Sequence, residues 1–242
     1  MITGCILTRN CQEDLLNLLP SISFLDEIVI VDDYSTDNTR EIAKSFNARI
    51  YKRKLDNNFA SQRNYALSKA KKGWIFFIDS DERVTSSLGN EIQKAVKENK
   101  SNGFYIKRTD IFLGKKLKFG ETSRIKLVRL AKKGYGKWKR PVHEYWDVKT
   151  KKTLKNPLIH HSHKNISSFV NKLNVYTNIE SNLRKKQGKK TNIFEITVFP
   201  IGKFIQNYII KLGFLDGFRG FVMASMMSIH SFLVRAKLQT NK

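Results

Sequence analysis

Residues 74–81 read WIFFIDSD, an apolar run that ends in two aspartates, Asp79 and Asp81. Such a run predicts a strand buried on both faces of a parallel sheet. Ligands of these sheets bind beyond the carboxyl ends of the strands, so we expect the aspartates at a binding crevice. Two carboxylates spaced by one residue can hold a hard divalent cation and contact a ribose. A turn that merely caps the next helix is the alternative.

A second apolar run, EIVIV at residues 27–31, is also followed by an acidic pair, Asp32 and Asp33. Strand and helix patterns alternate around the two runs, which predicts βαβ units and a mainly parallel sheet. The further strands are expected at 4–7 and 49–53, and the helices at 15–20, 36–46 and 60–71. Both acidic groups follow strands of one sheet, so we expect them to meet at one of its edges.

The pattern changes after residue 103, where basic and glycine-containing turns separate the apolar runs. Strands are expected at 104–108, 125–130 and 154–160, then a helix at 166–184 and a basic linker at 185–190. This region is expected to extend the sheet.

The last fifty residues are rich in apolar side chains. Residues 201–212 follow the spacing of an amphipathic helix that Gly213 can end. A second apolar segment covers 218–234, but its uncharged stretch is shorter than the roughly 20 residues that span a bilayer. The basic flanks of both segments suit helices that lie in an anionic membrane surface. Packing on the domain or in a dimer is the alternative.

The formal net charge of +24 attracts polyanions such as nucleic acid, anionic lipid headgroups and phosphorylated sugars. The two cysteines, Cys5 and Cys11, do not form a disulfide framework or a zinc-binding pattern, which favours a reducing compartment. The N-terminus lacks the basic and long apolar regions of a signal peptide, so we expect a cytoplasmic protein.

Two further segments, ILTRN at 6–10 and VIVDDYSTDNT at 29–39, precede the DSD turn in this order. Together they resemble the family 2 glycosyltransferases of GT-A fold, most strongly over residues 2–100. The resemblance implies an α/β, Rossmann-like fold: a mainly parallel sheet flanked by helices, here with a C-terminal amphipathic helical segment. It also implies an enzyme that transfers a sugar from a nucleotide-sugar donor with inversion at the anomeric carbon.

The resemblance implies a role for each matching residue. It places Thr8, Asn10 and Asp33 around a uridine, with Asp32 nearby. Asp79 and Asp81 would contact the ribose and a metal–diphosphate, the metal being Mg²⁺ or Mn²⁺. Arg63 would meet a phosphate or order its loop, whereas Asp37 and Thr39 are interpreted as helix capping.

Inverting transfer needs a base that deprotonates the acceptor hydroxyl, and a carboxylate suits this role. The Glu-Asp pair that many family members use does not follow the DSD turn. Residues 141–144, PVHE, resemble the VHE segment of a subgroup that includes lipopolysaccharide-core glucosyltransferases. We therefore predict Glu144 as the base, with His143 orienting it or binding the acceptor. A plain ion pair between Glu144 and a lysine is the alternative.

Residues 160–163, HHSH, form a histidine cluster without standard zinc spacing. A histidine of the same subgroup that matches His160 lies beside the diphosphate or metal, so His160 is a predicted metal ligand. His161 and His163 are interpreted as packing or acceptor contacts. Five basic residues could supply positive charge to a phosphorylated acceptor, with solvated surface positions as the alternative: Lys107, Arg108, Arg124, Lys126 and Arg129. The turn at 213–220, GFLDGFRG, also resembles the subgroup.

These observations divide the chain into a nucleotide-sugar-binding half (1–100), an acceptor and catalytic half of the same domain (101–190) and a membrane-associating tail (191–242). The leading hypothesis is a peripheral enzyme on the inner face of a bacterial membrane. It would transfer glucose from UDP-glucose to a glycolipid acceptor of the lipopolysaccharide or lipooligosaccharide core. A capsule or exopolysaccharide glycosyltransferase is a close alternative.

Two other classes fit less well. A basic nucleic-acid-binding protein would suit the charge, but no RNP-like strand or zinc finger is present, so no nucleic acid is expected as a partner. A sugar-nucleotide pyrophosphorylase would need a glycine-rich loop after the first strand, and residues 8–11 contain no glycine.

Overall fold

The computed structural model describes residues 1–240 apart from Lys72, Lys151 and Lys164, and gives the backbone alone for Arg124. The chain divides into two compact units. Unit 1 contains residues 1–108 and 126–160, and unit 2 contains residues 109–125 and 161–242. These bounds differ from the three segments expected from the sequence, and the roles given to those segments stay predictions.

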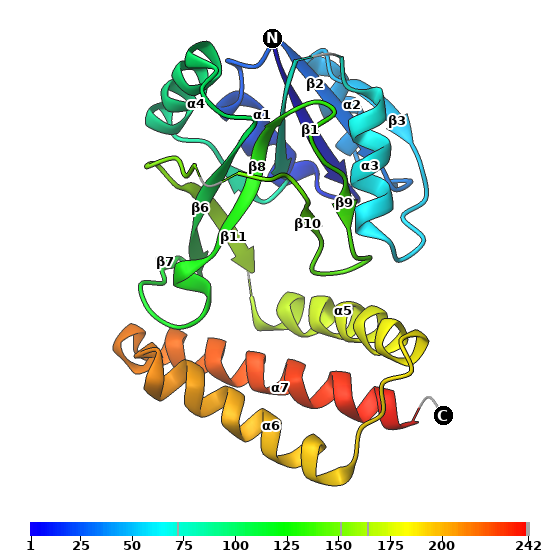
Figure 1. Ribbon diagram of the computed structural model, residues 1–242, viewed down its shortest axis with the longest axis vertical. Coiled ribbons are helices and arrows are strands. Elements are labelled where there is room, and N and C mark those ends of the chain that lie inside the picture. Colours follow the sequence, from blue (N-terminus) through cyan, green and yellow to red (C-terminus); the bar gives the residue numbers. More distant parts are fainter. Residues whose placement is uncertain (72, 151, 164, 241–242) are drawn as a thin grey trace. The chain divides into compact units, whose positions relative to one another are not determined.

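Unit 1 alternates strands and helices over its first hundred residues (Figure 1). Its strands are β1 (Ile2–Thr8), β2 (Glu27–Asp32), β3 (Arg49–Lys52), β4 (Trp74–Asp79), β5 (Glu82–Arg83), β8 (Lys126–Lys132), β9 (Trp138–Lys139) and β10 (Tyr145–Trp146). Its helices are α1 (Gln12–Ser21), α2 (Thr39–Ser45), α3 (Phe59–Lys69) and α4 (Ser86–Glu98). Strands β6 (Gly103–Phe112) and β11 (Leu158–His163) begin in unit 1 and end in unit 2.

The strand order of the main sheet is β3-β2-β1-β4-β8-β6-β11-β5. The first four strands are parallel to one another. β8 runs antiparallel to β4, and β6 runs antiparallel to β8. The α/β fold predicted from the sequence is therefore confirmed, with a parallel half that continues into a mixed half.

The alternation of side chains along β4 divides the core of unit 1 into two layers. Phe76 and Ile78 point toward a cluster that contains the leucines of α1 and Leu88 of α4. Phe77 points to the opposite face, where it packs with residues of α3 and of the β9–β10 hairpin. Asp79 is two residues after Phe77 and lies on the same face of the sheet, so its carboxylate is directed toward α3 and the hairpin.

Helix α4 was not predicted from the sequence, although its local signals are present. Thr85 caps its first turn by accepting the Leu88 N–H at 3.2 Å. Asn99 ends the helix in the left-handed conformation, with φ of 55°. Leu88 and Ile92 lie on its buried side, one helical turn apart. Helix α1 continues past the expected stop at Pro20 to Ser21.

Unit 2 contains three long helices, α5 (Ile166–Lys186), α6 (Ile193–Ile205) and α7 (Phe218–Thr240), in the part of the chain that the structure describes. Figure 1 shows α7 between α5 and α6, and α7 packs against both. Shorter elements complete the unit: β7 (Lys115–Lys116), η1 (Thr122–Arg124), the π-helical turn η2 (Gln206–Ile210) and η3 (Gly213–Asp216). Of the described helices, none is both long and apolar enough to cross a membrane.

The turn between α6 and α7 depends on glycine. A Cβ at Gly220 would lie 1.8 Å from the carbonyl oxygen of Gly213, so the two backbone segments approach at a distance that a larger residue prevents. Gly217 has a φ of +60°, a conformation that glycine adopts without steric cost. Glycines at positions 217 and 220 are therefore structural requirements of this turn.

We expect Cys5 to resist thiol reagents in the native protein. Its side chain is fully buried in β1, and burial raises the pKa of the thiol far above its usual value. A Cys11→Ser variant leaves Cys5 as the single thiol, and its labelling by a chromogenic disulfide reagent at pH ~8 should follow unfolding. Rapid labelling under native conditions would contradict the burial of β1.

Candidate functional site

The two acidic groups lie at the same edge of the sheet. In the parallel pairs of β1, Thr8 is opposite Asp32 and Leu7 is opposite Asp79. The carboxyl ends of β1, β2 and β4 therefore present both groups side by side, as the sequence predicts. This edge is where ligands of open α/β sheets bind.

Asp32 is fully buried and holds the loop that follows β2. Its carboxylate accepts hydrogen bonds from the Thr8 hydroxyl at 3.0 Å and from the Ser35 N–H at 2.9 Å. Because these contacts occupy both oxygens, the role of Asp32 in the described structure is to shape the loop. Its predicted position near a nucleotide stays a prediction.

Asn10 follows β1 and is exposed, whereas Asp33 follows β2 and is buried. Asp33 accepts hydrogen bonds from Arg9 at 2.9 Å and from the Leu55 N–H at 3.1 Å. The Asn10 side-chain oxygen accepts the Thr36 N–H at 2.8 Å. Asn10 itself has a φ of 46°, in the left-handed region that asparagine tolerates. The loops after β1 and β2 are thus joined by side-chain contacts.

Asp37 and Thr39 behave as the sequence suggests. Asp37 accepts the N–H groups of Gln12 and Thr39, each at 3.1 Å, at the start of α2. The Thr39 hydroxyl accepts the Cys11 N–H at 2.9 Å. Their contacts organise helix ends.

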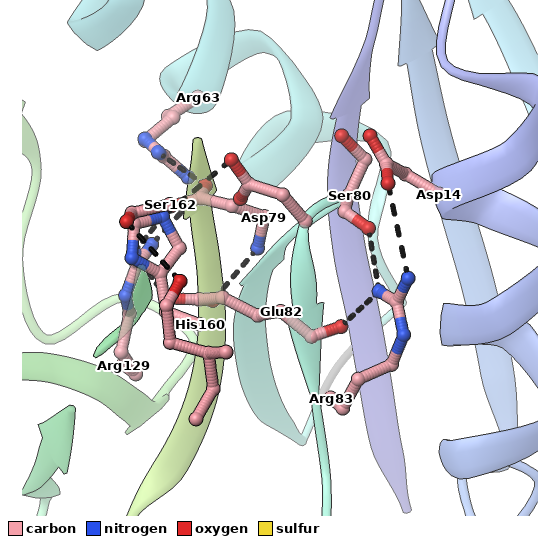
Figure 2. Close-up of polar contacts among 11 residues, drawn as sticks. Asp14, Arg63, Asp79, Ser80, Glu82, Arg83, Arg129, His160 and Ser162 are labelled. Carbon is pink, nitrogen blue, oxygen red and sulfur yellow. Dashed lines mark hydrogen bonds and ion pairs between the residues drawn. The ribbon is translucent and has the colours of Figure 1, made fainter. Parts of the chain in front are cut away.

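Asp79 is held by arginines from two different elements (Figure 2). One oxygen accepts from Arg63 of α3 at 2.7 Å, and the other accepts from Arg129 of β8 at 2.5 Å. The completely buried Glu82 joins the same cluster, because one of its oxygens accepts from Arg129 at 3.1 Å and the other accepts the Asp79 N–H at 2.9 Å. Both oxygens of the first aspartate of the DSD turn are therefore engaged by arginines.

A shift in strand register explains how Arg129 reaches Asp79. In the β6–β8 pair, Phe104 is opposite Leu130 but Tyr105 is opposite Val128, so Arg129 has no partner residue in β6. An extra residue of this kind re-aims the side chains on its strand. Arg129 is 3% exposed and is not available to a phosphorylated acceptor, so that part of the sequence interpretation is wrong.

The remaining basic residues of that set are placed differently. Lys107 and Lys126 are exposed at opposing positions of β6 and β8. The side chain of Arg124 lies outside the described residues.

A third arginine braces the turn from the other side. Arg83 donates to the backbone oxygens of Ser80 and Glu82 at 2.9 and 2.7 Å, and it lies 3.9 Å from Asp14 of α1 (Figure 2). The backbone of the DSD turn is thereby fixed before any ligand arrives.

Glu144 lies in the loop of the β9–β10 hairpin, and Arg63 connects it to the DSD turn. The Arg63 Nε donates to Glu144 at 2.8 Å while the Nη2 of the same guanidinium donates to Asp79. The neighbouring Asn64 holds the hairpin through two hydrogen bonds with the Trp138 backbone, each at 2.9 Å. Phe59 adds a contact from its N–H to the Pro141 carbonyl at 2.9 Å.

Arg63 is itself 5% exposed, and its guanidinium carbon lies 4.7 Å from the centre of the Trp138 ring. A guanidinium in this position is stabilised by the ring as well as by its carboxylates. His143 precedes Glu144 on the same loop, is exposed and has a φ of 49°. Glu144 and the acidic edge therefore belong to one connected site.

Asp81, the second aspartate of the turn, lies beside His160 of β11. The His160 Nε2 is 3.5 Å from an Asp81 oxygen, because His160 of β11 is opposite Glu82 in the pairing with β5. An imidazole and a carboxylate at this separation fit a shared divalent cation such as Mn²⁺ or Mg²⁺. Within the described residues, no three His, Cys, Asp or Glu side chains form a metal-binding group. A cation here would therefore complete its shell with ligand oxygens or water.

The other two histidines of the 160–163 cluster, His161 and His163, lie in unit 2. His163 stacks on Phe169 with ring centres 3.7 Å apart, and His161 is exposed. The packing role expected for His163 is confirmed.

The charges of the cluster shift two pKa values in opposite directions. Burial alone would raise the pKa of Asp79, but Arg129 and Arg63 outweigh burial and hold that pKa well below its usual value. Burial raises the pKa of Glu82, the negative charge of Asp79 adds to the increase, and Arg129 offsets only part of it. Asp79 is therefore the carboxylate that is ionised most firmly.

The family model described as "Glycosyl transferase family 2" matches residues 5–163. The chain belongs to this family. The match covers the whole sheet edge, the DSD turn, the hairpin with Glu144 and the strand with His160. The protein is thus a glycosyltransferase.

Relatives match this glycosyltransferase over nearly its full length. An uncharacterized glycosyltransferase of Rickettsia typhi is 26% identical, and the match covers 98% of this chain and 86% of the relative. The lipopolysaccharide core biosynthesis glycosyltransferase LpsC of Rhizobium meliloti is 23% identical, with 98% and 91% covered. The crystal structure of S. aureus TarS 1–349 in complex with UDP-GlcNAc superposes with a TM-score of 0.51 at 15% identity, covering 100% of this chain and 92% of that one. This last similarity supports the fold alone.

Residues that the sequence analysis missed complete the site of this glycosyltransferase. Glu82 directly follows the DSD turn, and its place next to a buried strand was the available signal. Gln62 and Asn64 flank Arg63 on α3, and Gln62 exchanges two hydrogen bonds with Arg53, each at 2.7 Å. The tripeptide 62–64 thus fixes three separate segments of unit 1.

We expect Asp79 to make the stability of unit 1 sensitive to acid. Because the folded-state pKa of Asp79 is lowered, its stabilising contribution is complete above about pH 4 and is lost as the pH falls further. An Asp79→Asn variant should therefore lose less stability than the wild type between about pH 4 and pH 2, as measured by urea unfolding. Glu41→Gln, at an exposed position of α2, is the control and should follow the wild type.

Proposed function

We propose that this glycosyltransferase transfers glucose from UDP-glucose, with inversion, to a lipopolysaccharide or lipooligosaccharide core acceptor. The observation that carries the proposal is the single chain of contacts from the sheet edge through Asp79 and Arg63 to Glu144. It joins the predicted donor site to the predicted base. The relationship to LpsC supports the class of acceptor.

The donor would lie along the edge formed by β1, β2 and β4. Thr8, Asn10 and Asp33 are the candidates for contact with the uridine. The buried Asp32 holds Thr8 in place by accepting a hydrogen bond from its hydroxyl, and Asn10 accepts the Thr36 N–H. Two arginines already donate to Asp79, so its proposed contact with the ribose or a metal would compete with them. Asp81 is the stronger candidate of the pair for contact with the diphosphate.

Asp81 and His160 would hold the divalent cation, Mg²⁺ or Mn²⁺, since their side chains lie 3.5 Å apart. Such a cation, when bound, supplies positive charge that balances the charge developing on a departing diphosphate. The rigid turn made by Arg83, Glu82 and Arg129 would hold Asp81 in position for this task.

Glu144 would accept the proton of the acceptor hydroxyl as that oxygen attacks the anomeric carbon. Arg63 would orient the carboxylate, because its Nε donates to one oxygen. The exposed His143 is placed on the same loop to orient the acceptor.

The acceptor proposal also implies a place of action. A core glycolipid is embedded in a membrane, so the enzyme would work as a peripheral protein on the inner face of a bacterial cell membrane. The exposed apolar side chains of unit 2 support this location.

A donor screen tests the proposal directly. Purified protein is incubated with UDP-, GDP- and TDP-sugars, with Mn²⁺, with Mg²⁺ or with a chelator, and release of the nucleotide is measured. We expect release from a UDP-sugar, dependent on the divalent cation. Release from none of these donors would remove the proposal.

Replacing Asp81 by asparagine should weaken the metal dependence, with about 10- to 100-fold more Mn²⁺ needed for half-maximal release. Asp56→Asn is the matched control, because Asp56 is exposed and its left-handed backbone, with φ of 48°, suits asparagine. Undiminished release by the Asp81 variant at limiting Mn²⁺ would exclude Asp81 as a ligand.

A further inference from the structure

One helix of unit 2 exposes an apolar stripe. Side chains at i, i+4, i+7 and i+11 of α6 point away from α7 and are 43–65% exposed; these are Phe194, Val198, Ile201 and Ile205. We name them the α6 face. On the other side of the helix, Ile196 and Pro200 are buried. Monomeric soluble proteins rarely expose a contiguous apolar surface of this kind.

The structure separates the roles of the two C-terminal helices. The sequence suggested that both lie in a membrane surface, but Val222, Met223 and Val234 of α7 are buried. α7 lies between α5 and α6 and forms the core of the unit (Figure 1). The apolar surface continues from α6 into the following turn, where Leu215 and Phe218 are 54% and 67% exposed.

A basic loop is anchored beside that turn. Asp216 accepts the N–H groups of Lys118 and Phe119 at 3.0 and 2.9 Å, and Asn207 accepts the Glu121 N–H at 3.1 Å. The loop carries three exposed lysines, Lys115, Lys116 and Lys118. Residues almost a hundred positions apart in the chain thus place positive charge next to the apolar turn, as Figure 1 shows for β7 and the end of α6.

The acidic side chains of this region do not offset that charge. Unit 2, residues 109–125 and 161–242, contains seventeen Lys and Arg but five Asp and Glu. Glu121 pairs with Lys203 of α6 at 2.6 Å. Glu180 pairs with Arg184 at 2.8 Å, Glu195 accepts from the Thr191 hydroxyl at 2.9 Å, and Asp216 holds the loop. Unit 2, which carries the α6 face, therefore has a large excess of basic side chains.

We infer that the α6 face and the basic loop dock on an anionic phospholipid bilayer, with α6 parallel to the membrane plane. Apolar side chains flanked by lysines fit the boundary between acyl chains and anionic headgroups. A second copy of the chain is a poorer occupant, because each copy carries +24 and would bring its own lysines to the contact. The inference gives a surface to the membrane location within the proposed function, but its test does not require activity.

Vesicle sedimentation tests the docking surface. The full chain is mixed with vesicles of phosphatidylcholine alone or of phosphatidylcholine with phosphatidylglycerol, and the bound fraction is measured. We expect binding to the anionic vesicles, weakened by salt, and little binding to the neutral ones. Equal binding to both would overturn the electrostatic part of the inference.

Two pairs of variants separate the contributions. Phe194→Ser with Ile201→Ser should weaken binding to anionic vesicles at least about tenfold, whereas Leu16→Ser on α1, which is 51% exposed, should not. Lys115→Gln with Lys116→Gln should weaken it roughly 25-fold, and the exposed pair Lys94→Gln with Lys97→Gln on α4 should have a much smaller effect. If the Phe194 and Ile201 variant binds anionic vesicles as well as the wild type does, the inference is wrong.

Light scattering and UDP release distinguish membrane docking from a contact between two copies of the chain and from a failure of the proposed function. If light scattering shows a dimer that the Phe194 and Ile201 substitutions dissociate, and vesicles are not bound, the α6 face is a contact between copies. UDP release measured without vesicles should be the same for all four variants and the wild type. Vesicle binding without UDP release from any donor would overturn the proposed function and leave the docking surface standing.

Discussion

Replacing Arg129 by methionine is expected to destabilise unit 1 by about 3–5 kcal/mol. The change removes the partner of Glu82, which is completely buried, and one of the two arginines that hold Asp79. Leaving a buried charge without its partner lowers the free energy of unfolding by far more than an exposed ion pair raises it. At about 2–4 °C per kcal/mol for a protein of this size, the melting temperature should fall by roughly 6–20 °C. Tryptophan fluorescence is a suitable probe, because Trp74, Trp138 and Trp146 all belong to unit 1.

A double variant distinguishes charge imbalance from lost packing. Arg129→Met with Glu82→Gln removes the unpaired charge and should recover a large part of the loss. Arg129→Lys should be intermediate, since one ammonium group does not reproduce the fork that reaches Asp79 and Glu82 together. If Arg129→Met melts at the wild-type temperature, the cluster does not support the DSD turn. If the double variant is no more stable than the single one, packing rather than charge is responsible.

The sequence predicted the parallel half of the sheet because its signals are local. Apolar runs of β-branched and aromatic residues, such as 27–31 and 74–78, can be buried on both sides only within such a sheet. The topology of βαβ units then requires that the carboxylates after β2 and β4 share an edge. Thr8 opposite Asp32 and Leu7 opposite Asp79 follow from these two facts.

The contacts of Arg129 could not be predicted in the same way. Strict alternation along β8 would place Val128 and Arg129 on opposite faces of the sheet. The register shift between Phe104 and Tyr105 of β6 interrupts this alternation at Arg129. A shift of this kind depends on the partner strand, more than twenty residues earlier in the chain. The sequence therefore gave no reason to separate Arg129 from the exposed lysines near it.

The same limit applies to unit 2. The turn at 213–220 was recognised in the sequence, but the sequence did not indicate which residues its aspartate, Asp216, contacts. Asp216 caps the backbone of a loop 97 and 98 residues away, at Phe119 and Lys118. Contacts between a side chain and a distant backbone leave no periodic pattern. The position of the basic loop beside the turn between α6 and α7 is thus information from the structure.

Replacing Glu144 by glutamine is expected to reduce sugar transfer about 10²- to 10⁴-fold while binding of UDP is retained. Glutamine has the same shape, and its side-chain oxygen can still accept the hydrogen bond from the Arg63 Nε. The variant should therefore fold and keep the hairpin in place, but it lacks a basic carboxylate. Transfer to a core glycolipid is followed by mass spectrometry of the product, and UDP binding is followed by calorimetry.

The opposing hypothesis is that Glu144 is one more acidic partner in a highly basic protein. Glu98→Gln is the matched control, because Glu98 pairs with Lys100 at 3.6 Å on an exposed surface, and its loss should leave transfer unchanged. Glu144→Asp supplies the second comparison: it keeps a carboxylate but withdraws it from the Arg63 Nε, so part of the activity should remain. Full turnover by Glu144→Gln would show that the base is another group and that Glu144 serves Arg63. Equal loss of UDP binding and transfer would show instead that Glu144 acts by holding Arg63, and through it Asp79, at the sheet edge.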